Sequence, residues 1–331
     1  MEIVGTIRKV RVDCNFDTIV KNLLVAGIDA FRINYAKFDD GKLMQEDFWD
    51  LYERVAKYTN NVLIDLPYPG SKYRLHSPKA KVLIVEGMTY YICFDMKSYN
   101  VGYKKNNVFY INQDIDVSII YENMKIIYDM GQGAFSVKKK FERNMIEIQA
   151  DNSFVLFNGK SIAFETYIYK RNNYDRVEEL CRQLQPSRLA FSFVENKEDL
   201  EEALSLKEKH NFILVSKIET QKAIQNLDEI LVYTDEIMLG RGDIGIYGSE
   251  KHLLDYEKYI AYKCKKKSKP FYFASDFLTS WSYNYIPVRS ELIDLECALE
   301  LQPTGLILNV DLVLSSNINR VIKYIKEMVD K

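Results

Sequence analysis

The chain has 331 residues, enough for one large domain or for a barrel that carries an inserted module. Hydrophobic residues make up 47% and charged residues 28%, which is typical of a globular protein and excludes a disordered one. Lysine and arginine number 45 against 47 aspartates and glutamates, so the formal charge of -2 gives no sign of a nucleic-acid or membrane partner.

The cysteines and the apolar runs indicate the compartment. Five cysteines are scattered without a C-x-x-C pair, which fits a reducing compartment better than a disulfide framework. The start of the chain lacks the apolar core of a signal peptide, and no apolar run approaches the roughly 20 residues that span a bilayer. We therefore expect a cytoplasmic protein.

Short β-branched runs alternate with amphipathic stretches in the first part of the chain. Their spacing predicts strands at residues 2–7, 30–34 and 61–66, and helices at residues 16–28 and 46–59. This alternation is typical of parallel strand–helix–strand units.

The pattern changes near residue 75. From about Lys79 to Phe164 the chain reads as short alternating strands separated by glycine, asparagine and aspartate. We interpret residues 77–165 as a small antiparallel β-barrel or sandwich, inserted between two parts of a larger domain at residues 1–76 and 166–331.

The strand–helix alternation returns after the insertion. Strands are predicted at residues 187–193, 212–218, 236–240, 270–275 and 304–309, with helices between them and after the last one. Three strands before the insertion and five after it make the eight parallel strands of a (β/α)8 TIM barrel. The alternative, an open doubly wound sheet, needs a glycine-rich phosphate loop after the first strand, and TIRKVR is not one.

In such a barrel the working side chains lie where the strands end. Lys217 and Glu219 are two positions apart at a strand end, so both point to one face, where a simple salt bridge would explain the pair equally well. Asp243 follows the neighbouring strand, and two carboxylates from adjacent strands can hold Mg²⁺ or Mn²⁺. The Lys217 ammonium would then stabilise negative charge that develops on a substrate oxygen.

Other predicted strands also end in polar residues: Arg32, Asn34, Asp65, Arg241, Gly242, Ser275 and Asp276. The sequence GRGDIG contains three glycines that let the backbone approach a ligand closely. Its free N–H groups could receive a carboxylate or a phosphate, and a simple tight loop is the alternative.

The segment VSKIETQKAIQNLDEILVYTDEIMLGRGDIG resembles the active-site stretch of the pyruvate kinase family, with its Lys-Ile-Glu strand and its Arg-Gly-Asp-(Leu/Ile)-Gly turn. The segments SRLAFSFVENKEDL, PFYFASDFLTSW and PVRSEL are similar to further motifs of that family, and AFRIN and IDLPYPGSKYR match two more loosely. The β module lies where the family carries its mobile lid domain. The resemblance covers nearly the whole chain and implies a short, divergent member without the family's C-terminal domain.

The resemblance also implies roles for single residues. Glu219 and Asp243 would bind the divalent metal, Mg²⁺ or Mn²⁺. Three residues would be catalytic. Lys217 matches the residue that stabilises the phosphoryl group and the enolate oxygen, and Arg32 matches the residue that contacts phosphate. Ser275 matches a residue near the site of enolate protonation. The substrate-binding residues would be Arg241, Gly242, Asn34 and Asp65, and further candidates for phosphate binding are Lys72, Arg74 and Lys160.

The sequence departs from the family pattern on the nucleotide side. The family's Gly-Pro-Ala-Ser after the first strand is replaced by Arg-Lys-Val-Arg at residues 8–11, and its Ser-Gly-Glu-Thr near the last strand by Asn-Val-Asp-Leu at residues 309–312. Asn34 and Asp65 match two ligands of the family's monovalent-cation site. Ala36 and Leu66 replace the other two ligands, so we expect the K⁺ site to be altered or absent.

Three functions therefore stay open. The first is pyruvate-kinase-like, metal-dependent phosphoryl transfer that involves phosphoenolpyruvate, pyruvate or a related 2-oxo acid. The second is a nucleotide-independent, metal-dependent lyase or aldolase acting on a 2-oxo acid, and the third is a non-catalytic ligand-binding protein. The expected partner is a small phosphorylated or 2-oxo acid substrate, with no nucleic acid and no membrane. The use of a nucleotide and the oligomeric state are left open.

Overall fold

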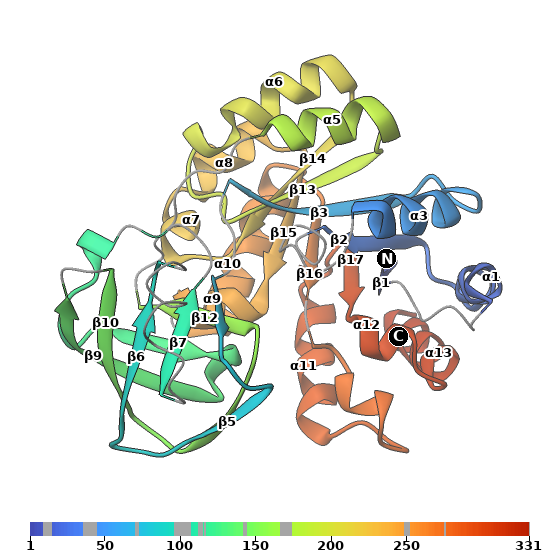
Figure 1. Ribbon diagram of the computed structural model, residues 1–331. Helices are drawn as coiled ribbons and strands as arrows, with labels where there is room; N and C mark the ends of the chain where they lie inside the picture. The colour runs from blue at the N-terminus through green and yellow to red at the C-terminus, as the bar shows by residue number, and fades with distance from the viewer. Residues whose placement is uncertain are drawn as a thin grey trace. The chain divides into compact units, whose positions relative to one another are not determined.

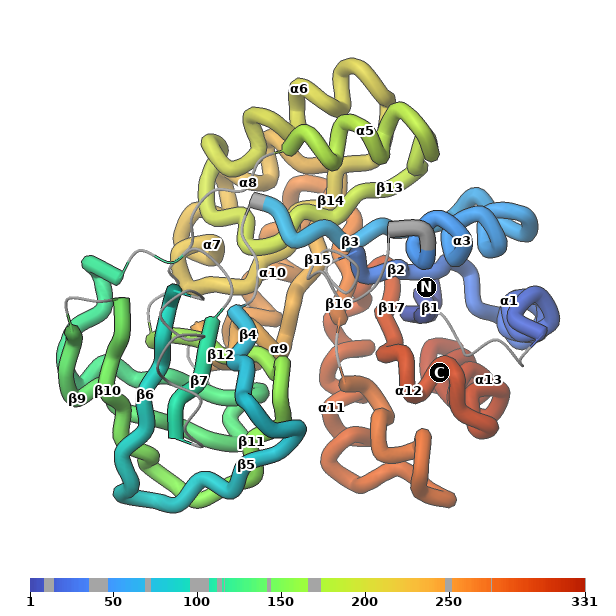
Figure 2. Tube along the Cα trace, in the orientation of Figure 1, coloured from blue at the N-terminus to red at the C-terminus, as the bar shows by residue number. Residues whose placement is uncertain are grey.

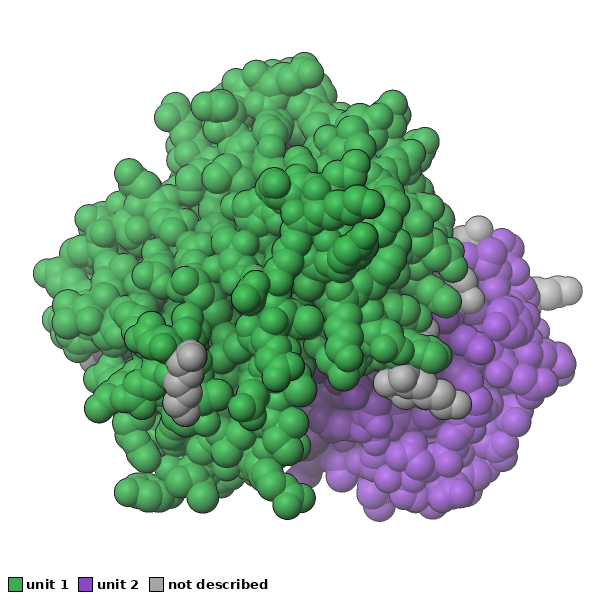
Figure 3. Space-filling model, turned by 180° about the vertical axis from the view of Figure 1, so that it is seen from behind, with its two compact units in different colours: residues 1–69, 173–244, 250–331 green, residues 70–172, 245–249 purple. Residues whose placement is uncertain are grey.

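The computed structural model describes residues 1–8, 15–35, 45–69, 73–95, 107–111, 115, 117–141, 144–165, 174–247, 252–274 and 276–330. The chain divides into two compact units (Figure 3). Unit 1 comprises Met1–Pro69, Asn173–Ile244 and Glu250–Lys331, and unit 2 comprises Gly70–Asn172 and Gly245–Ser249. No helix in the described parts of the chain is long and apolar enough to cross a membrane.

Among the described residues, unit 1 is built on a closed barrel of eight parallel strands, which confirms the predicted fold class. The strands are β1 (Glu2–Ile7), β2 (Ala30–Asn34), β3 (Val62–Pro69), β13 (Arg188–Ser192), β14 (Ile213–Ile218), β15 (Glu236–Gly240), β16 (Phe271–Ala274) and β17 (Gly305–Leu308). The barrel closes because β1 pairs with both β2 and β17. The three strands before the insertion and the five after it are those predicted.

Helices lie around the outside of this barrel (Figure 1). They are α1 (Phe16–Ala26), α3 (Gln45–Ala56), α5 (Asp175–Leu184), α6 (Glu201–His210), α7 (Gln221–Gln225), α8 (Leu227–Tyr233), α9 (Arg241–Tyr247), α10 (Leu253–Lys266), α11 (Arg289–Glu300), α12 (Val310–Val313) and α13 (Ile318–Val329), with the short 3₁₀ helices η3 (Glu198–Leu200) and η5 (Thr279–Ser282). The spacing of apolar residues decides which face each helix buries. In α13, for example, Ile318, Val321, Ile322 and Ile325 recur at helical spacing and are the buried residues.

Two helical segments differ from the expectation. The helix predicted between the strands at residues 212–218 and 236–240 is divided at Asn226, which caps the end of α7 before α8 begins. The glycine-rich segment expected as a turn instead starts α9, so Gly242 and Asp243 lie in the first turn of a helix.

Side chains alternate in direction along each strand, so the inside of the barrel is layered. Apolar residues fill the middle layer: Val4, Ala30, Leu63, Ala190, Val215, Met238, Ala274 and Ile307. At the amino ends of the strands, Arg188 pairs with Glu2 (Nη1–Oε1 3.1 Å) and with Glu236 (Nη2–Oε2 2.7 Å). Its guanidinium also lies 4.8 Å from the centre of the Tyr272 ring. These charged groups close the amino end of the barrel, and the carboxyl end is left for the site.

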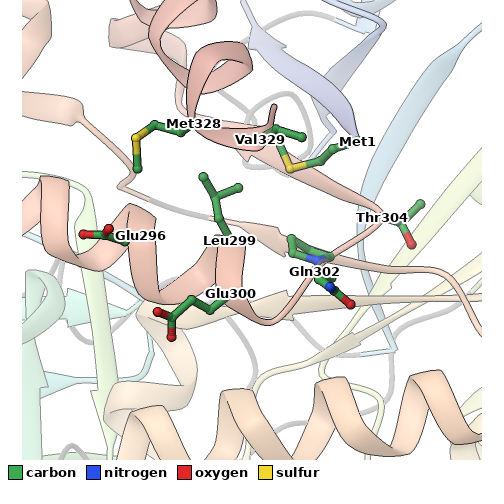
Figure 4. A pocket seen from close by; sticks show the side chains of 9 residues that line it. Met1, Glu296, Leu299, Glu300, Gln302, Thr304, Met328 and Val329 are labelled. Atoms are coloured by element: carbon green, nitrogen blue, oxygen red, sulfur yellow. The ribbon is translucent and has the colours of Figure 1, made fainter. Parts of the chain in front are cut away.

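Met1 lies close to Val329, the last residue of α13, at the amino end of the barrel (Figure 2). Both line a pocket of about 650 Å³, together with residues around the end of α11 (Figure 4). Thr304, just before β17, also lines this pocket. The pocket therefore lies at the amino ends of the strands, opposite the carboxyl ends where the site residues were predicted.

Unit 2 contains the β module. A second closed barrel is formed by β4 (Tyr73–His76), β6 (Thr89–Cys93), β7 (Val108–Ile111), β8 (Lys125–Tyr128), β9 (Gly133–Phe141), β10 (Met145–Ala150) and β12 (Lys160–Phe164), while β5 (Lys81–Ile84) and β11 (Phe154–Phe157) form a separate two-stranded sheet. The short 3₁₀ helices η1 (Val117–Ile119) and η2 (Asp129–Gly131) connect strands of this unit.

Two features of unit 2 differ from the expectation. Residues 73–76, which we assigned to the first part of the large domain, form β4 of the smaller barrel. The reason is that Tyr73 and Leu75 alternate inward and are buried in the core of that barrel. The pairing is also not entirely antiparallel, because β6 and β7 pair in parallel.

Candidate active site

The carboxyl end of the large barrel holds a compact cluster of charges around Lys217. The Lys217 ammonium lies 3.1 Å from Asp65 Oδ1 and 3.1 Å from Glu219 Oε1, and it donates a hydrogen bond of 2.9 Å to Ser192 Oγ. The side chains are 8% exposed for Lys217, 2% for Asp65 and 1% for Glu219. Buried charges are tolerated only when they are paired in this way.

Arg32 extends the cluster. Its Nε donates to Asp65 Oδ2 at 2.9 Å, its Nη2 makes a second, shorter contact with the same oxygen, and its Nη1 donates to Thr6 Oγ1 at 3.2 Å. Asp65 therefore binds Lys217 with one carboxylate oxygen and Arg32 with the other. It holds two cations side by side at the mouth of the barrel.

The charge states follow from these contacts. Burial alone would raise the pKa of Asp65, but the Lys217 ammonium and the Arg32 guanidinium outweigh it and hold this pKa below its usual value. Burial alone would lower the pKa of Lys217, but the carboxylates of Asp65 and Glu219, with a contribution from Asp243, raise it. Both partners therefore stay ionised at neutral pH.

The position of Glu219 is fixed by backbone features of two strands. Glu219 Oε2 accepts a hydrogen bond of 2.9 Å from the backbone N–H of Phe193, a residue with a left-handed φ of 56° just after β13. A Cβ atom on Gly240, at the end of β15, would lie 2.8 Å from Glu219 Oε1 and 2.7 Å from its Cγ. Only glycine at position 240 leaves room for the carboxylate.

Asp243 lies in the first turn of α9, after the strand that pairs with β14, and its side chain is buried. The charge of Asp243 contributes to the raised pKa of Lys217, which places its carboxylate within electrostatic reach of the ammonium. The described residues contain no group of three or more His, Cys, Asp or Glu side chains arranged to hold a metal ion. The metal-ligand roles expected for Glu219 and Asp243 stay a prediction.

The structure commits Arg241 to contacts outside the barrel. Its Nε lies 3.0 Å from Glu257 Oε1 on α10, its Nη2 donates to Asp294 on α11, and its guanidinium lies 4.2 Å from the centre of the Phe277 ring. The contact between Arg241 and Glu257 is a close ion pair. These contacts anchor the start of α9, and the substrate-binding role expected for Arg241 stays a prediction.

The remaining predicted residues are placed as follows. Asn34 is the last residue of β2 and is the ladder partner of Asp65. In unit 2, Arg74 Nη1 donates to the carbonyl of Gly159 at 3.1 Å, and Lys160 pairs with Asp129 at 2.8 Å. Ser275, Lys72, Ala36 and residues 9–11 lie outside the described residues.

Two residues of the cluster were missed by the sequence analysis. Ser192 accepts from Lys217 and donates to the backbone carbonyl of Leu66 at 2.7 Å, so its hydroxyl connects the ends of β13, β14 and β3. Thr6 accepts from Arg32. A usable signal existed, because both residues occupy the inward-facing register near the carboxyl ends of apolar strands.

The replaced residues on the nucleotide side also have defined places. Arg8, directly after β1, pairs with Asp311 at 3.2 Å, and both side chains are exposed. Asn309 accepts from the Leu312 N–H as the N-cap of α12 and donates to Thr279 Oγ1 at 2.5 Å. The polar side chains after β1 and β17 therefore include an exposed ion pair, whereas the charges of the Lys217 cluster are buried.

These features define the class of protein: a (β/α)8 barrel with a charged site at the carboxyl ends of its strands and a second small barrel inserted after its third strand. The chain belongs to the pyruvate kinase family, because the family model described as "Pyruvate kinase, barrel domain" matches residues 1–305.

Curated relatives agree with this assignment. The chain is 26% identical over 291 residues to a pyruvate kinase of Sporosarcina psychrophila, which covers 85% of this chain and 48% of that protein. It is 24% identical over 313 residues to a pyruvate kinase of Leishmania mexicana, which covers 92% of this chain and 62% of that protein. A cytosolic isozyme of pyruvate kinase from Nicotiana tabacum is 34% identical over 113 residues, 34% of this chain and 22% of that protein. The chain thus spans between about half and three-fifths of the first two relatives.

Proposed function

We propose that this protein is a metal-dependent phosphotransferase of the pyruvate kinase type that acts on phosphoenolpyruvate, pyruvate or a related 2-oxo acid. The observation that carries the proposal is the buried Lys217 ammonium, held by Asp65 and Glu219 at the carboxyl end of the barrel. Family membership supports the same class of chemistry.

The donor set fits a divalent cation. Lys217 and Arg32 supply two formal positive charges, and Asp65, Glu219 and Asp243 supply three negative ones, which leaves one negative charge in excess. Glu219 and Asp243 would hold Mg²⁺ or Mn²⁺, since these hard ions prefer carboxylate oxygens, and Gly240 leaves the space that the Glu219 carboxylate needs. When bound, such an ion neutralises charge on the phosphoryl oxygens and on the oxygen of a developing enolate.

The cations of this chain would do the remaining electrostatic work. Phosphoryl transfer needs little covalent chemistry from the protein, so positioning and charge stabilisation carry most of the effect. Asp65 fixes Arg32 and Lys217 side by side before substrate arrives, which spares the reorganisation that free side chains would need. Arg32 would contact the phosphate, and Lys217 would stabilise negative charge on the oxygen between phosphate and carbon.

Backbone groups would orient the 2-oxo acid. Gly242 lies in the first turn of α9, where helical N–H groups have no partner within the helix. A substrate carboxylate could accept from these groups. The hydroxyl of Ser192 helps to hold the Lys217 ammonium in place by accepting a hydrogen bond from it.

The acceptor can be identified by a spectroscopic assay. Phosphoenolpyruvate is incubated with the protein and Mg²⁺, with ADP, with other diphosphates or without any nucleotide, each with and without K⁺. We expect pyruvate to form only when a diphosphate acceptor is present. Pyruvate formation without any acceptor would select the lyase hypothesis, and binding without turnover in every arm would select the non-catalytic one.

A further inference from the structure

The turn between β15 and α9 carries Asp243 but has few side chains with which to hold itself in place. The sequence of this turn is Gly240, Arg241, Gly242 and Asp243, so Arg241 provides the one long side chain that can reach other elements. One glycine on each side of Arg241 gives the backbone of this turn more conformational freedom than other residues would. Whatever fixes the Arg241 guanidinium therefore also fixes the backbone that presents Gly242 and Asp243.

The guanidinium is held from three directions by groups outside the Lys217 cluster. Glu257 on α10 lies 3.0 Å from its Nε, Asp294 on α11 accepts from its Nη2, and the face of Phe277 packs against it at 4.2 Å. The Glu257 side chain is 5% exposed, whereas Asp294 is 34% exposed. Glu257 is therefore the partner that water cannot replace.

The cost of this arrangement suggests that it serves more than stability. Burial raises the pKa of Glu257 even though Arg241 opposes the shift, so ionised Glu257 is held at some expense. Buried ion pairs often contribute no more to stability than apolar residues of the same volume, but they do fix one geometry. A charged pair at this place would specify where the start of α9 lies.

We propose that Glu257 is a positioning residue for the metal site, which acts through Arg241 on the backbone of Gly242 and on the carboxylate of Asp243. The inference rests on the proposed function, in which Asp243 is a ligand of a divalent cation. Glu257 touches neither the cation nor the substrate. Its role is to hold Asp243, through Arg241, in the orientation that binds the cation before the cation arrives.

The same strand offers a matched control. Glu236, the first residue of β15, is also a buried glutamate that pairs with an arginine, because Arg188 Nη2 lies 2.7 Å from its Oε2. Burial raises its pKa as well. Glu257→Gln and Glu236→Gln therefore each remove one buried carboxylate charge from an arginine, Glu236 at the start of β15 and Glu257 beside Arg241, which follows the end of β15.

Mn²⁺ binding to the full chain, followed by the electron paramagnetic resonance signal of the free ion, tests the proposal. We expect Glu257→Gln to weaken Mn²⁺ binding by about 10-fold, the lower end of what loss of an outer-sphere partner usually causes. The kcat at saturating Mn²⁺ should change far less than the Mn²⁺ concentration needed for half-maximal activity. Glu236→Gln should leave Mn²⁺ affinity within about twofold of wild type, because its partner does not touch the site. Equal Mn²⁺ affinity in Glu257→Gln and wild type, or equal weakening in Glu236→Gln, would overturn the proposal.

A second readout does not depend on the metal. Hydrogen exchange should become faster at residues 241–247 in Glu257→Gln and stay unchanged there in Glu236→Gln, because only the first variant frees the turn. If wild type bound no Mn²⁺, the proposed function would fail, while the exchange rates would still decide the positioning role. If Glu257→Gln failed to fold, Asp294→Asn would take its place, with a smaller effect in the same direction because Asp294 is more exposed.

Discussion

Lys217 is the residue on which the proposed chemistry depends. An ammonium group with 8% of its side chain exposed would lose its proton in an apolar pocket, but Asp65 and Glu219 lie 3.1 Å away and keep it charged. Asp65 pairs with Arg32 at the same time. One carboxylate thus holds both cations in position, so the removal of Asp65 should disturb Lys217 and Arg32 together.

Asp65→Asn should therefore destabilise the protein in a way that depends on pH. Because the pKa of Asp65 in the folded protein lies below its usual value of 3.8, its contribution is fully present above that pH and is lost as the pH falls through the folded pKa. At pH 7 we expect the free energy of unfolding to fall by about 3 to 5 kcal/mol, as for other broken buried pairs.

Urea unfolding of wild type and Asp65→Asn at several pH values measures this difference. The difference should shrink as the pH falls below 3.8, because the unfolded chain takes up a proton on Asp65 there while the folded protein does so only at lower pH. Asp235→Asn is the control, because its partner Lys207 is part-exposed and such pairs contribute about 1 kcal/mol or less. A gap between Asp65→Asn and wild type that stayed constant from pH 7 to pH 3 would contradict the account.

The sequence allowed part of this cluster to be predicted and not the rest. Lys217 and Glu219 could be paired because they are two positions apart on one strand, which a period of two places on one face. The contact between Lys217 and Asp65 could not be derived from local spacing, because it depends on β3 and β14 both lying beside β13. Ser192 was missed for the same reason: its partners lie on the two strands that flank its own.

At the scale of single elements, the junction of β15 and α9 shows how backbone and site are linked. The strand ends in Gly240 because the Glu219 carboxylate occupies the space of a side chain, and α9 then begins at once with Arg241. From the sequence alone, three closely spaced glycines predicted a turn. Propensity was overridden here by packing, because Arg241 anchors the first turn of the helix against α10 and α11.

Gly240→Ala tests this junction. The added Cβ would lie 2.7 Å from Glu219 Cγ and 2.8 Å from Oε1, so Glu219 must move. We expect Mn²⁺ affinity and kcat/KM to fall by about 10-fold or more, with a loss of stability of about 1 to 3 kcal/mol from overpacking.

Gly245→Ala serves as the comparison. A Cβ atom at that position would have no atom of the described residues within 4 Å, and alanine is the better helix former. This variant should keep wild-type Mn²⁺ affinity and gain up to about 1 kcal/mol of stability. If Gly240→Ala bound Mn²⁺ and turned over substrate as well as Gly245→Ala does, the close packing of Glu219 on Gly240 would have no functional meaning.

At the scale of the whole molecule, the large barrel could be predicted because its strands are short apolar runs separated by amphipathic helices, and each parallel pair needs such a helix to connect it. The smaller barrel was predicted only in outline. No local feature of the sequence assigns strand β4 to one unit or the other. It belongs to the smaller barrel because Tyr73 and Leu75 are buried in the core of that barrel. The parallel pair of β6 and β7 likewise depends on non-local pairing that alternation cannot reveal.

The two ends of the large barrel have different tasks, and Arg188 can separate them. Arg188 joins Glu2 on the first strand to Glu236 on β15, far from the Lys217 cluster at the other end of the strands. Arg188→Met should lower the free energy of unfolding by about 3 to 5 kcal/mol, because it leaves the buried Glu236 carboxylate and the partly buried Glu2 carboxylate without their cation. Thermal and urea unfolding measure the loss, while Mn²⁺ affinity should remain that of wild type. A loss of Mn²⁺ affinity in the folded variant would show that the two ends are coupled.

The most direct test of the central claim measures phosphoryl transfer from phosphoenolpyruvate by Lys217→Met in the presence of Mg²⁺. Lys207→Met is the control, because it removes a lysine that pairs with an aspartate outside the site. The account predicts that Lys217→Met folds and loses at least about 1,000-fold in kcat, since a preorganised charge at a developing anion contributes about that much, and that Lys207→Met retains wild-type activity. A folded Lys217→Met protein with wild-type turnover would contradict it.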